Sequence, residues 1–295
     1  MKNGDELMAL KDIQSLRELA EMSIKVGSRV DYTQGGGGNT SVKLDNGYMA
    51  IKASGTRLSQ MTENKGFAVV QVSDLKDVTA DFGYDPLRPS VEASFHVLLK
   101  KFVCHTHPVY ANIPLCSIEG TARIIKIMKE IDASYLILPY INPGKELADY
   151  MKKGLTEAIP QAVIPDHEEE FDYTDEDSNR RPIAVFMQNH GLVVSADTAE
   201  KCLEIHEKIN ELIAMEYGIK EGDFDAFAKD AAKTLYPDQQ VYMSLGDVQQ
   251  EIFAAVSFIH HVIINNNETI RGMDDSAMDF IGNWESEAYR KTVLS

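Results

Sequence analysis

The sequence has few cysteines, few cations relative to acids, and no run of about 20 apolar residues such as a membrane span needs. Its three cysteines, Cys104, Cys116 and Cys202, show no Cys-x-x-Cys spacing, which argues against a disulfide framework and a thiolate metal site. A net charge of −17 disfavours nucleic acid and anionic membrane surfaces as partners. The first five residues lack the apolar core of a signal peptide, so we expect a cytoplasmic protein.

What is present is an ordinary globular composition. Hydrophobic residues make up 44% of the 295 residues and charged residues 25%. The length allows a full core, and one large domain with an extension fits it as well as two domains do.

Apolar periodicity predicts several helices and strands. Helical spacing covers residues 7–26, 91–99, 119–131, 144–158, 198–217 and 247–264. Strand patterns cover residues 42–44, 48–53, 102–107, 135–138, 183–187 and 192–194. Periodicity alone predicts a parallel sheet. The acidic stretch 165–182 is expected to be a solvated loop without a chemical role.

Two histidines, His105 and His107, stand one residue apart at the end of an apolar strand. Residues i and i+2 of a strand project from the same face, so both side chains point to one spot. Pro108 cannot donate to a sheet ladder and ends the strand there. Converging imidazoles suit a divalent transition metal, most often zinc. The alternative is a pair of solvated histidines, because a catalytic zinc site usually has three protein ligands.

His190 is the best third ligand that the sequence offers. It lies between two predicted strands, at a break that also contains Gly191. His260 and His261 are consecutive on a predicted helix and point about 100° apart, which makes them poor partners for one ion.

Three stretches rich in hydrogen-bond donors could hold an anionic group. Glycines 35–38 precede Asn39 at a strand entrance, where backbone amides can approach a ligand closely, although a flexible turn has the same composition. Residues 52–57 and 88–90 are similar, and each stretch lies near a cation, Lys52, Arg57 or Arg88. Ser90 also precedes the predicted helix 91–99, whose N-terminus would favour an anion.

Glu92 lies in the first turn of that predicted helix. An acid there is commonly favoured by the helix dipole alone. The functional alternative is a carboxylate that serves the metal site as ligand or base.

In their order along the chain, these motifs resemble the class II aldolase/adducin family. The resemblance covers the first two thirds of the chain and rests on the motifs Gly38-Asn39-Thr40-Ser41-Val42, Ala53-Ser54-Gly55, Pro89-Ser90-Val91-Glu92, His105-Thr106-His107-Pro108 and Asn189-His190-Gly191. Closer still, residues 34–43, 51–56, 236–239 and 283–290 look like the aldolase part of bifunctional rhamnulose-phosphate aldolase/alcohol dehydrogenases.

The resemblance implies a three-layer α/β/α sandwich around a largely antiparallel, mixed sheet. We expect a catalytic domain over residues 1–220 and a helical extension over residues 221–295 packed on it. Zinc is implied as the cofactor, and homo-oligomers, often ring tetramers, are implied as the assembly. The implied site has Glu92 as catalytic acid/base, the metal ligands His105, His107 and His190, and the phosphate-binding residues Gly38, Asn39, Ser54, Gly55 and Ser90.

Two departures from the family pattern stand out. Fuculose-phosphate aldolases have a second serine where Val91 stands here, so one phosphate donor is missing. The tyrosine that some members receive from a neighbouring subunit has no counterpart that the sequence identifies.

The expected activity is zinc-dependent retro-aldol cleavage of a ketose phosphate, L-rhamnulose 1-phosphate first, to dihydroxyacetone phosphate and L-lactaldehyde. A sugar-phosphate 4-epimerase or a dehydratase would use the same metal site. An adducin-like binding module without catalysis is the alternative from another class, and the presence of all three histidines and Glu92 argues against it.

Overall fold

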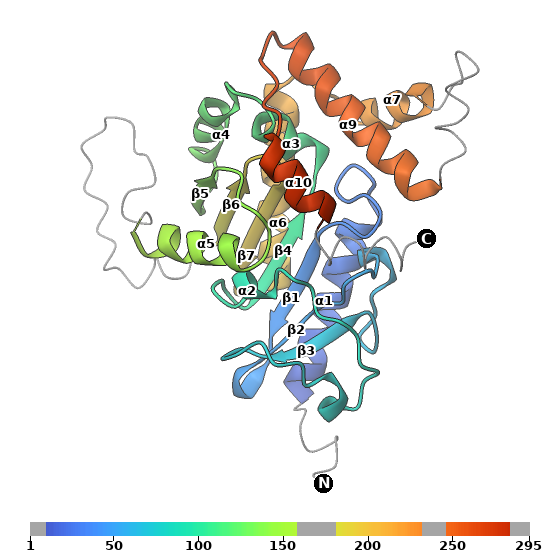
Figure 1. The fold of residues 1–295 in the computed structure, drawn as a ribbon, viewed down its shortest axis with the longest axis vertical. Helices are drawn as coiled ribbons and strands as arrows, with labels where there is room; N and C mark the ends of the chain where they lie inside the picture. The colour runs from blue at the N-terminus through green and yellow to red at the C-terminus, as the bar shows by residue number, and fades with distance from the viewer. Residues whose placement is uncertain (1–9, 158–180, 232–245, 284–295) are drawn as a thin grey trace.

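A seven-stranded sheet forms the centre of the protein. The computed structural model describes residues 10–157, 181–231 and 246–283, and the sheet has the order β3-β2-β1-β4-β7-β6-β5. Figure 1 shows the chain from its N-terminal to its C-terminal part. The strands are β1 (Asn39–Lys43), β2 (Tyr48–Lys52), β3 (Phe67–Gln71), β4 (Phe102–Thr106), β5 (Ser134–Leu138), β6 (Ile183–Met187) and β7 (Gly191–Ala196).

Five of the six strand pairs are antiparallel, and β5 with β6 is the parallel one. The mixed, largely antiparallel sheet implied by the family resemblance is therefore confirmed, and the parallel sheet expected from periodicity is wrong. Periodicity misleads here because strands covered on both faces read as continuous apolar runs, whatever their direction.

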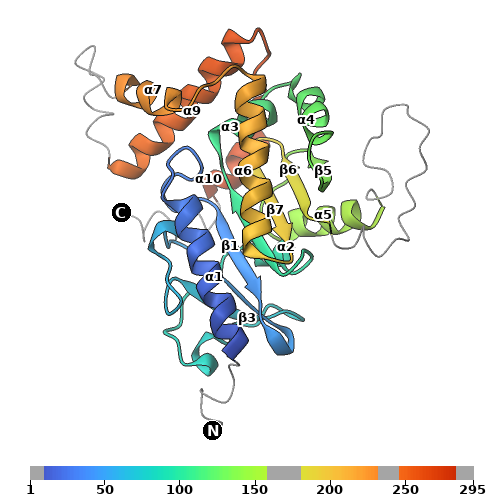
Figure 2. The same ribbon diagram turned by 180° about the vertical axis from the view of Figure 1, so that it is seen from behind.

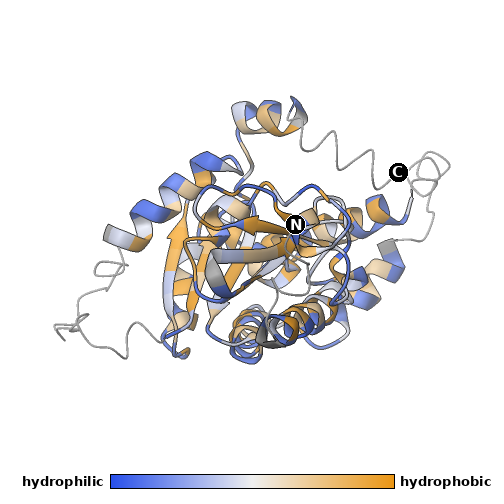
Figure 3. Ribbon diagram, turned by 90° about the horizontal axis from the view of Figure 1, so that it is seen from below, coloured by the Kyte–Doolittle hydropathy of each residue, from blue (hydrophilic) through white to orange (hydrophobic). Residues whose placement is uncertain are grey.

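Helices cover both faces of the sheet. On one face α1 (Leu10–Gly27) and α6 (Ala199–Glu216) lie side by side, as Figure 2 shows. On the other face lie α2 (Ala93–His96) and α5 (Lys145–Glu157). Seen from below in Figure 3, hydrophobic strands lie between helices with hydrophilic outer sides. The remaining helical segments before residue 221 are η2 (Asp45–Gly47), η3 (Leu58–Gln60), η4 (Thr79–Phe82), α3 (Val109–Leu115) and α4 (Gly120–Met128).

Strand β4 shows how the two faces are filled. Cys104 belongs to the core that includes residues of α1 and α6, whereas Val103 packs in the second core with Phe95 and Met151. Each such side chain is fully buried and contributes about 1.5–3 kcal/mol to the hydrophobic stabilisation. His105, the next residue along, is also fully buried, so β4 is enclosed by the core up to the candidate metal site.

The predicted helix 91–99 is wrong in length. Its helical part is the four-residue α2, and Glu92 occupies the position just before it. An anion site built on a helix N-terminus is therefore not available beside Ser90. The acidic stretch 165–182 and the motifs 236–239 and 283–290 lie almost entirely outside the described residues.

Among the described residues after 220 lie the helices α7 (Asp223–Ala231), α9 (Asp247–Asn265) and α10 (Asp275–Asn283). Helix α9 packs against α3 and α7, with Phe258 in edge contact with Phe224 and Phe227. Among the described helices, none has the length and hydropathy that crossing a membrane requires.

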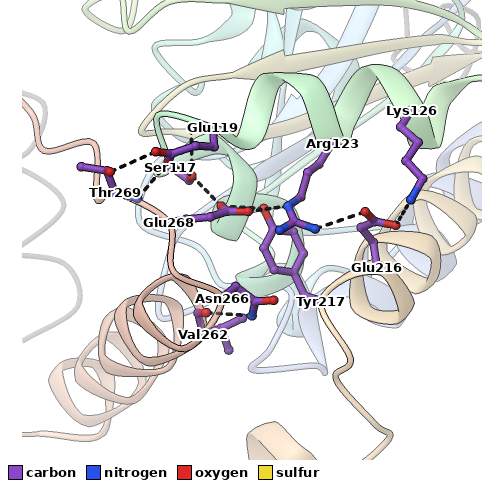
Figure 4. A network of polar contacts seen from close by, with 10 residues as sticks. All are labelled: Ser117, Glu119, Arg123, Lys126, Glu216, Tyr217, Val262, Asn266, Glu268 and Thr269. Atoms are coloured by element: carbon purple, nitrogen blue, oxygen red, sulfur yellow. Dashed lines mark hydrogen bonds and ion pairs between the residues drawn. The ribbon is translucent and has the colours of Figure 1, made fainter.

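The segment after α9 is held by a buried carboxylate, that of Glu268 (Figure 4). Ser117 Oγ donates to Glu268 at 2.6 Å, Tyr217 OH donates at 3.0 Å, and the Arg123 guanidinium pairs with the same carboxylate. Arg123 also pairs with Glu216 at 3.1 Å. This network ties the chain after α9 to α4 and α6.

Glu268→Gln should therefore lower the free energy of unfolding by about 1–3 kcal/mol, because the amide is a poorer acceptor for Ser117 and Tyr217 and leaves Arg123 with Glu216 alone as counter-charge. Chemical denaturation of the whole chain measures the change. Glu204→Gln is the matched control, since Glu204 forms an exposed pair with Lys201 and its loss should cost at most about 0.5 kcal/mol. Equal effects of the two variants would contradict a structural role for Glu268.

Candidate metal centre

The structure brings His105, His107 and His190 together. His105 is on β4, His107 follows that strand directly, and His190 lies in the turn between β6 and β7. Strands β4 and β7 are paired neighbours in the sheet, so the turn before β7 lies beside the end of β4. Ring nitrogens of the three histidines lie within 4.8 Å of one another.

The ring of His105 is oriented by the sheet itself. Its Nδ1 donates to the Leu192 carbonyl oxygen at 3.1 Å, which leaves Nε2 as a lone-pair donor toward the other histidines. Burial lowers the pKa of His105 to about 4, so the ring is neutral at pH 7. A neutral imidazole held in one orientation is the form that binds a metal.

The turn that carries His190 has a strained backbone and several supports. Asn189 adopts a left-handed conformation with φ of 53°. Its backbone N–H donates to Leu115 O at 3.2 Å, and its Nδ2 donates to Arg271 O at 2.6 Å. The second contact comes from the chain after α9, so the C-terminal part of the protein helps to place a candidate metal ligand.

Two glycines allow the backbone to approach the histidines. A Cβ on Gly191 would lie 2.4 Å from Thr106 O and 3.0 Å from His107 Cδ2. Gly38 has φ of +64°, and a Cβ there would lie 2.6 Å from His105 O. Only glycine fits at these positions, where the loops before β1 and β7 contact the end of β4.

Glu92 completes the cluster. Its Oε1 lies 3.2 Å from His190 Nε2, its Oε2 lies 3.5 Å from His105 Nε2, and Asn39 Nδ2 donates to Oε2 at 2.6 Å. Burial alone would raise the pKa of Glu92. Electrostatic attraction to His105 and hydrogen bonds from His190 and Asn39 nevertheless hold this pKa well below its usual range. Glu92 is therefore a carboxylate at neutral pH.

The donor set and its spacing fit a divalent ion. Three nitrogens that share one zinc ion at about 2.1 Å in tetrahedral geometry lie about 3.4 Å apart. His105 Nε2 and His107 Nε2 are 3.2 Å apart. Three imidazoles beside one carboxylate are the ligand types that suit zinc and its neighbours in the first transition row.

A cleft of about 260 Å³ lies over this cluster. The five residues expected to bind a phosphate all line it: Gly38, Asn39, Ser54, Gly55 and Ser90. A backbone hydrogen bond from Ser54 N to Arg88 O at 2.8 Å and a bridge between Ala53 and Pro89 join two of the donor-rich stretches. The structure thus places three separate sequence motifs in one cavity.

The three cations expected near the phosphate have different positions. Lys52 lines the cleft, and its Nζ donates to Gly36 O at 2.9 Å and to Thr56 O at 2.7 Å, which joins the glycine loop to the loop after β2. Arg57 instead pairs with Glu251 of α9 at 3.0 Å. Among the described residues that line the cleft, Arg88 does not appear. Lys52 is thus the one of the three that can meet an anion there.

Sequence reasoning missed several residues of the cleft. Tyr140 follows β5, and Met273 and Ile281 come from the C-terminal part. No local pattern singles out Met273 or Ile281, because only the packing of α10 brings them to the site. Tyr140 had one usable signal, since a polar ring directly after a predicted strand is a position where sites often form.

Comparison with known proteins identifies the family of this chain. The sequence profile described as Class II Aldolase and Adducin N-terminal domain matches residues 17–217. The chain therefore belongs to the class II aldolase and adducin family. A comparison with curated proteins yields no match.

Solved structures share the fold at low sequence identity. An L-fuculose 1-phosphate aldolase has a TM-score of 0.50 at 21% identity, over 85% of this chain and 98% of that one. An aldolase II superfamily protein from Pseudomonas syringae has a TM-score of 0.52 at 13% sequence identity, over 87% of this chain and 96% of that one. YgbL from Klebsiella pneumoniae, named as a candidate aldolase/epimerase/decarboxylase, has a TM-score of 0.50 at 19% sequence identity, over 70% of this chain and 90% of that one. At these identities the similarity shows the fold alone.

Gly191→Ala should weaken metal binding by about 10-fold or more, because the added methyl group meets the Thr106 carbonyl and displaces the ends of β4 and β7 that carry the histidines. Titration of the metal-free protein with zinc measures the affinity. Gly272→Ala is the control, since nothing lies within 4 Å of its added Cβ. Unchanged affinity in Gly191→Ala would show that the glycine does not shape the site.

Proposed function

We propose that the protein is a zinc-dependent class II aldolase that cleaves L-rhamnulose 1-phosphate to dihydroxyacetone phosphate and L-lactaldehyde. The observation that carries the proposal is the convergence of His105, His107, His190 and Glu92 at the floor of one cleft with the donor-rich loops. The substrate follows from the closer resemblance to rhamnulose-phosphate aldolases.

Cleavage of a carbon–carbon bond next to a carbonyl leaves an enediolate, whose negative charge needs stabilisation. A divalent ion held by His105, His107 and His190 would supply that stabilisation as a Lewis acid, worth several kcal/mol. The buried carboxylate of Glu92 is positioned to move the proton at the enediolate carbon. Asn39 orients this carboxylate through its 2.6 Å hydrogen bond.

The phosphate would bind at the end of the cleft lined by Gly38, Ser54 and Ser90. Backbone amides of the glycine loop and serine hydroxyls suit phosphate oxygens. Lys52 is 3% exposed and adds a positive charge in a protein that is otherwise strongly acidic. Val91 lines the same cleft without a hydroxyl, so the phosphate would have one donor fewer than in fuculose-phosphate aldolases.

The proposal also covers the domains of the chain, its assembly and its location in the cell. We propose a catalytic domain over residues 1–220 with a helical extension over residues 221–295, a homo-oligomeric assembly such as a homotetramer, and a cytoplasmic location. The family match over residues 17–217 supports the domain division, because it ends where the extension begins.

Glu92→Gln should keep the bound metal and lower kcat by about 100- to 10,000-fold, because the amide preserves the shape but cannot accept a proton. Metal content and steady-state kinetics are measured on the same sample. Glu200→Gln, on the exposed start of α6, is the control and should behave as wild type. Near-normal turnover would remove Glu92 from the mechanism, and loss of metal would make it a ligand instead.

Release of dihydroxyacetone phosphate from L-rhamnulose 1-phosphate should require the metal, because the metal would stabilise the enediolate charge as a Lewis acid, whereas Lys52 is assigned to the phosphate. A coupled assay over a panel of ketose 1- and 5-phosphates, with and without a chelator, tests this. Release from another ketose alone would change the substrate and keep the aldolase. An epimerised or dehydrated product without triose phosphate would contradict the aldolase, and no turnover despite bound metal would favour a binding module.

A further inference from the structure

The strand order separates the two ends of the cleft. Gly38 and Asn39 lie at the start of β1 and Ser54 follows β2, on one side of β4 in the sheet. Tyr140 follows β5, which is the edge strand on the other side. The histidines of β4 and of the turn before β7 lie between these ends. A ligand whose phosphate occupies the β1–β2 end therefore points across the histidines toward Tyr140.

Tyr140 is brought to the site by the parallel pairing of β5 and β6. Leu138 pairs with Met187, and Gln188 N donates to Leu138 O at 3.0 Å. The residues that follow each strand, Tyr140 and His190, therefore reach the same cavity.

The hydroxyl of Tyr140 is buried and has no hydrogen-bond partner among the residues that the structure describes. A buried polar group without a partner costs about 1–3 kcal/mol, so a bound molecule that supplied one would be favoured there. Burial first, and then the charges of Asp274 and Glu146, raise the pKa of Tyr140. The phenol stays protonated at neutral pH and can donate a hydrogen bond.

Three other lining residues at this end of the cleft, Pro143, Met273 and Ile281, are apolar, and the amide of the polar Asn189 is already bonded to Arg271 O. Pro143 lies in the same loop as Tyr140, and Met273 and Ile281 cover the site from the segment before α10 and from α10. Among the described lining residues at this end there is no Lys or Arg. The surroundings therefore suit an uncharged group that carries one oxygen and an apolar carbon.

We propose that Tyr140 contacts the substrate and donates a hydrogen bond to the oxygen of its aldehyde half, while Met273 and Ile281 contact the apolar carbon beyond it. This inference rests on the proposed aldolase function and assigns the part of the substrate that leaves as aldehyde. Tyr140 acts only where that half is present. Reactions of the triose-phosphate half alone depend on the histidines and Glu92 and not on Tyr140.

Two measurements on one protein sample separate these halves. The first is condensation of dihydroxyacetone phosphate with L-lactaldehyde. The second is exchange of the hydroxymethyl proton of dihydroxyacetone phosphate with deuterated solvent, which needs no aldehyde. Tyr140→Phe should lower condensation by about 10- to 100-fold and leave exchange within about twofold, because only the aldehyde loses a hydrogen bond. Tyr150→Phe, on the exposed side of α5, is the matched control and should change neither.

Equal loss of both reactions in Tyr140→Phe, or no loss of condensation, would overturn the assignment. A wild-type protein that neither exchanges nor condenses would refute the proposed aldolase function, and the role of Tyr140 with it. A wild-type protein that does both, with Tyr140→Phe indistinguishable from it, would refute the role of Tyr140 alone.

A second variant tests the apolar part and does not depend on how Tyr140→Phe folds. Ile281→Ser should lower the preference for L-lactaldehyde over glycolaldehyde, which lacks the methyl group, by about 5- to 10-fold. The ratio of the two rates is independent of the fraction of active protein. Met278→Ser, at a 52% exposed position of the same helix, is the control. An unchanged ratio in Ile281→Ser would place the methyl group elsewhere.

Discussion

The antiparallel pairing of β4 with β7 is the constraint on which the rest of the site depends. It places the end of one central strand beside the turn that starts the other, with His105 opposite Val193 and bonded through its ring to Leu192 O. The same pairing brings His107, which directly follows β4, close to His190, which directly precedes β7. Because both strands are fully buried in the middle of the sheet, the hydrophobic core holds His105 itself, and it holds the strand ends beside which the partly buried His107 and His190 lie.

Around this centre, buried polar groups hold the carboxylate of Glu92 beside the histidines. Asn39 pairs in register with His105 across β1 and β4, and its amide therefore reaches Glu92. Nearby His96 and His206 are also fully buried, but they bond to Ser41 at 2.7 Å and to Thr106 at 2.6 Å. Burial lowers the pKa of each to about 3, so they support the strands as neutral groups.

The C-terminal helices belong to the site in a physical sense. Glu251 of α9 accepts a hydrogen bond from Gly35 N at 2.6 Å and pairs with Arg57, so it holds two of the loops that surround the cleft. Arg271 O accepts from Asn189 in the turn that carries His190, and Glu268 anchors the same segment. A change in the packing of these helices therefore reaches both the glycine-rich loop proposed to hold the phosphate and the turn that carries His190.

The sequence by itself determined the helices and strands with strong periodicity, the histidine pair on one strand face and the donor-rich loops. Those features depend on neighbours along the chain, for example the two-residue repeat that aligns His105 with His107. The ordered motifs also indicated the family and, through it, the mixed sheet.

Strand direction, the short α2 and the role of Arg57 were decided by tertiary structure alone. Arg57 meets Glu251 from a helix 194 residues away in sequence. Tyr140 reaches the cleft because β5 pairs with β6, and Met273 and Ile281 reach it because the chain at and before α10 lies against the cleft. Such contacts carry no local signal, since the free energy that selects them is the burial of whole surfaces against one another.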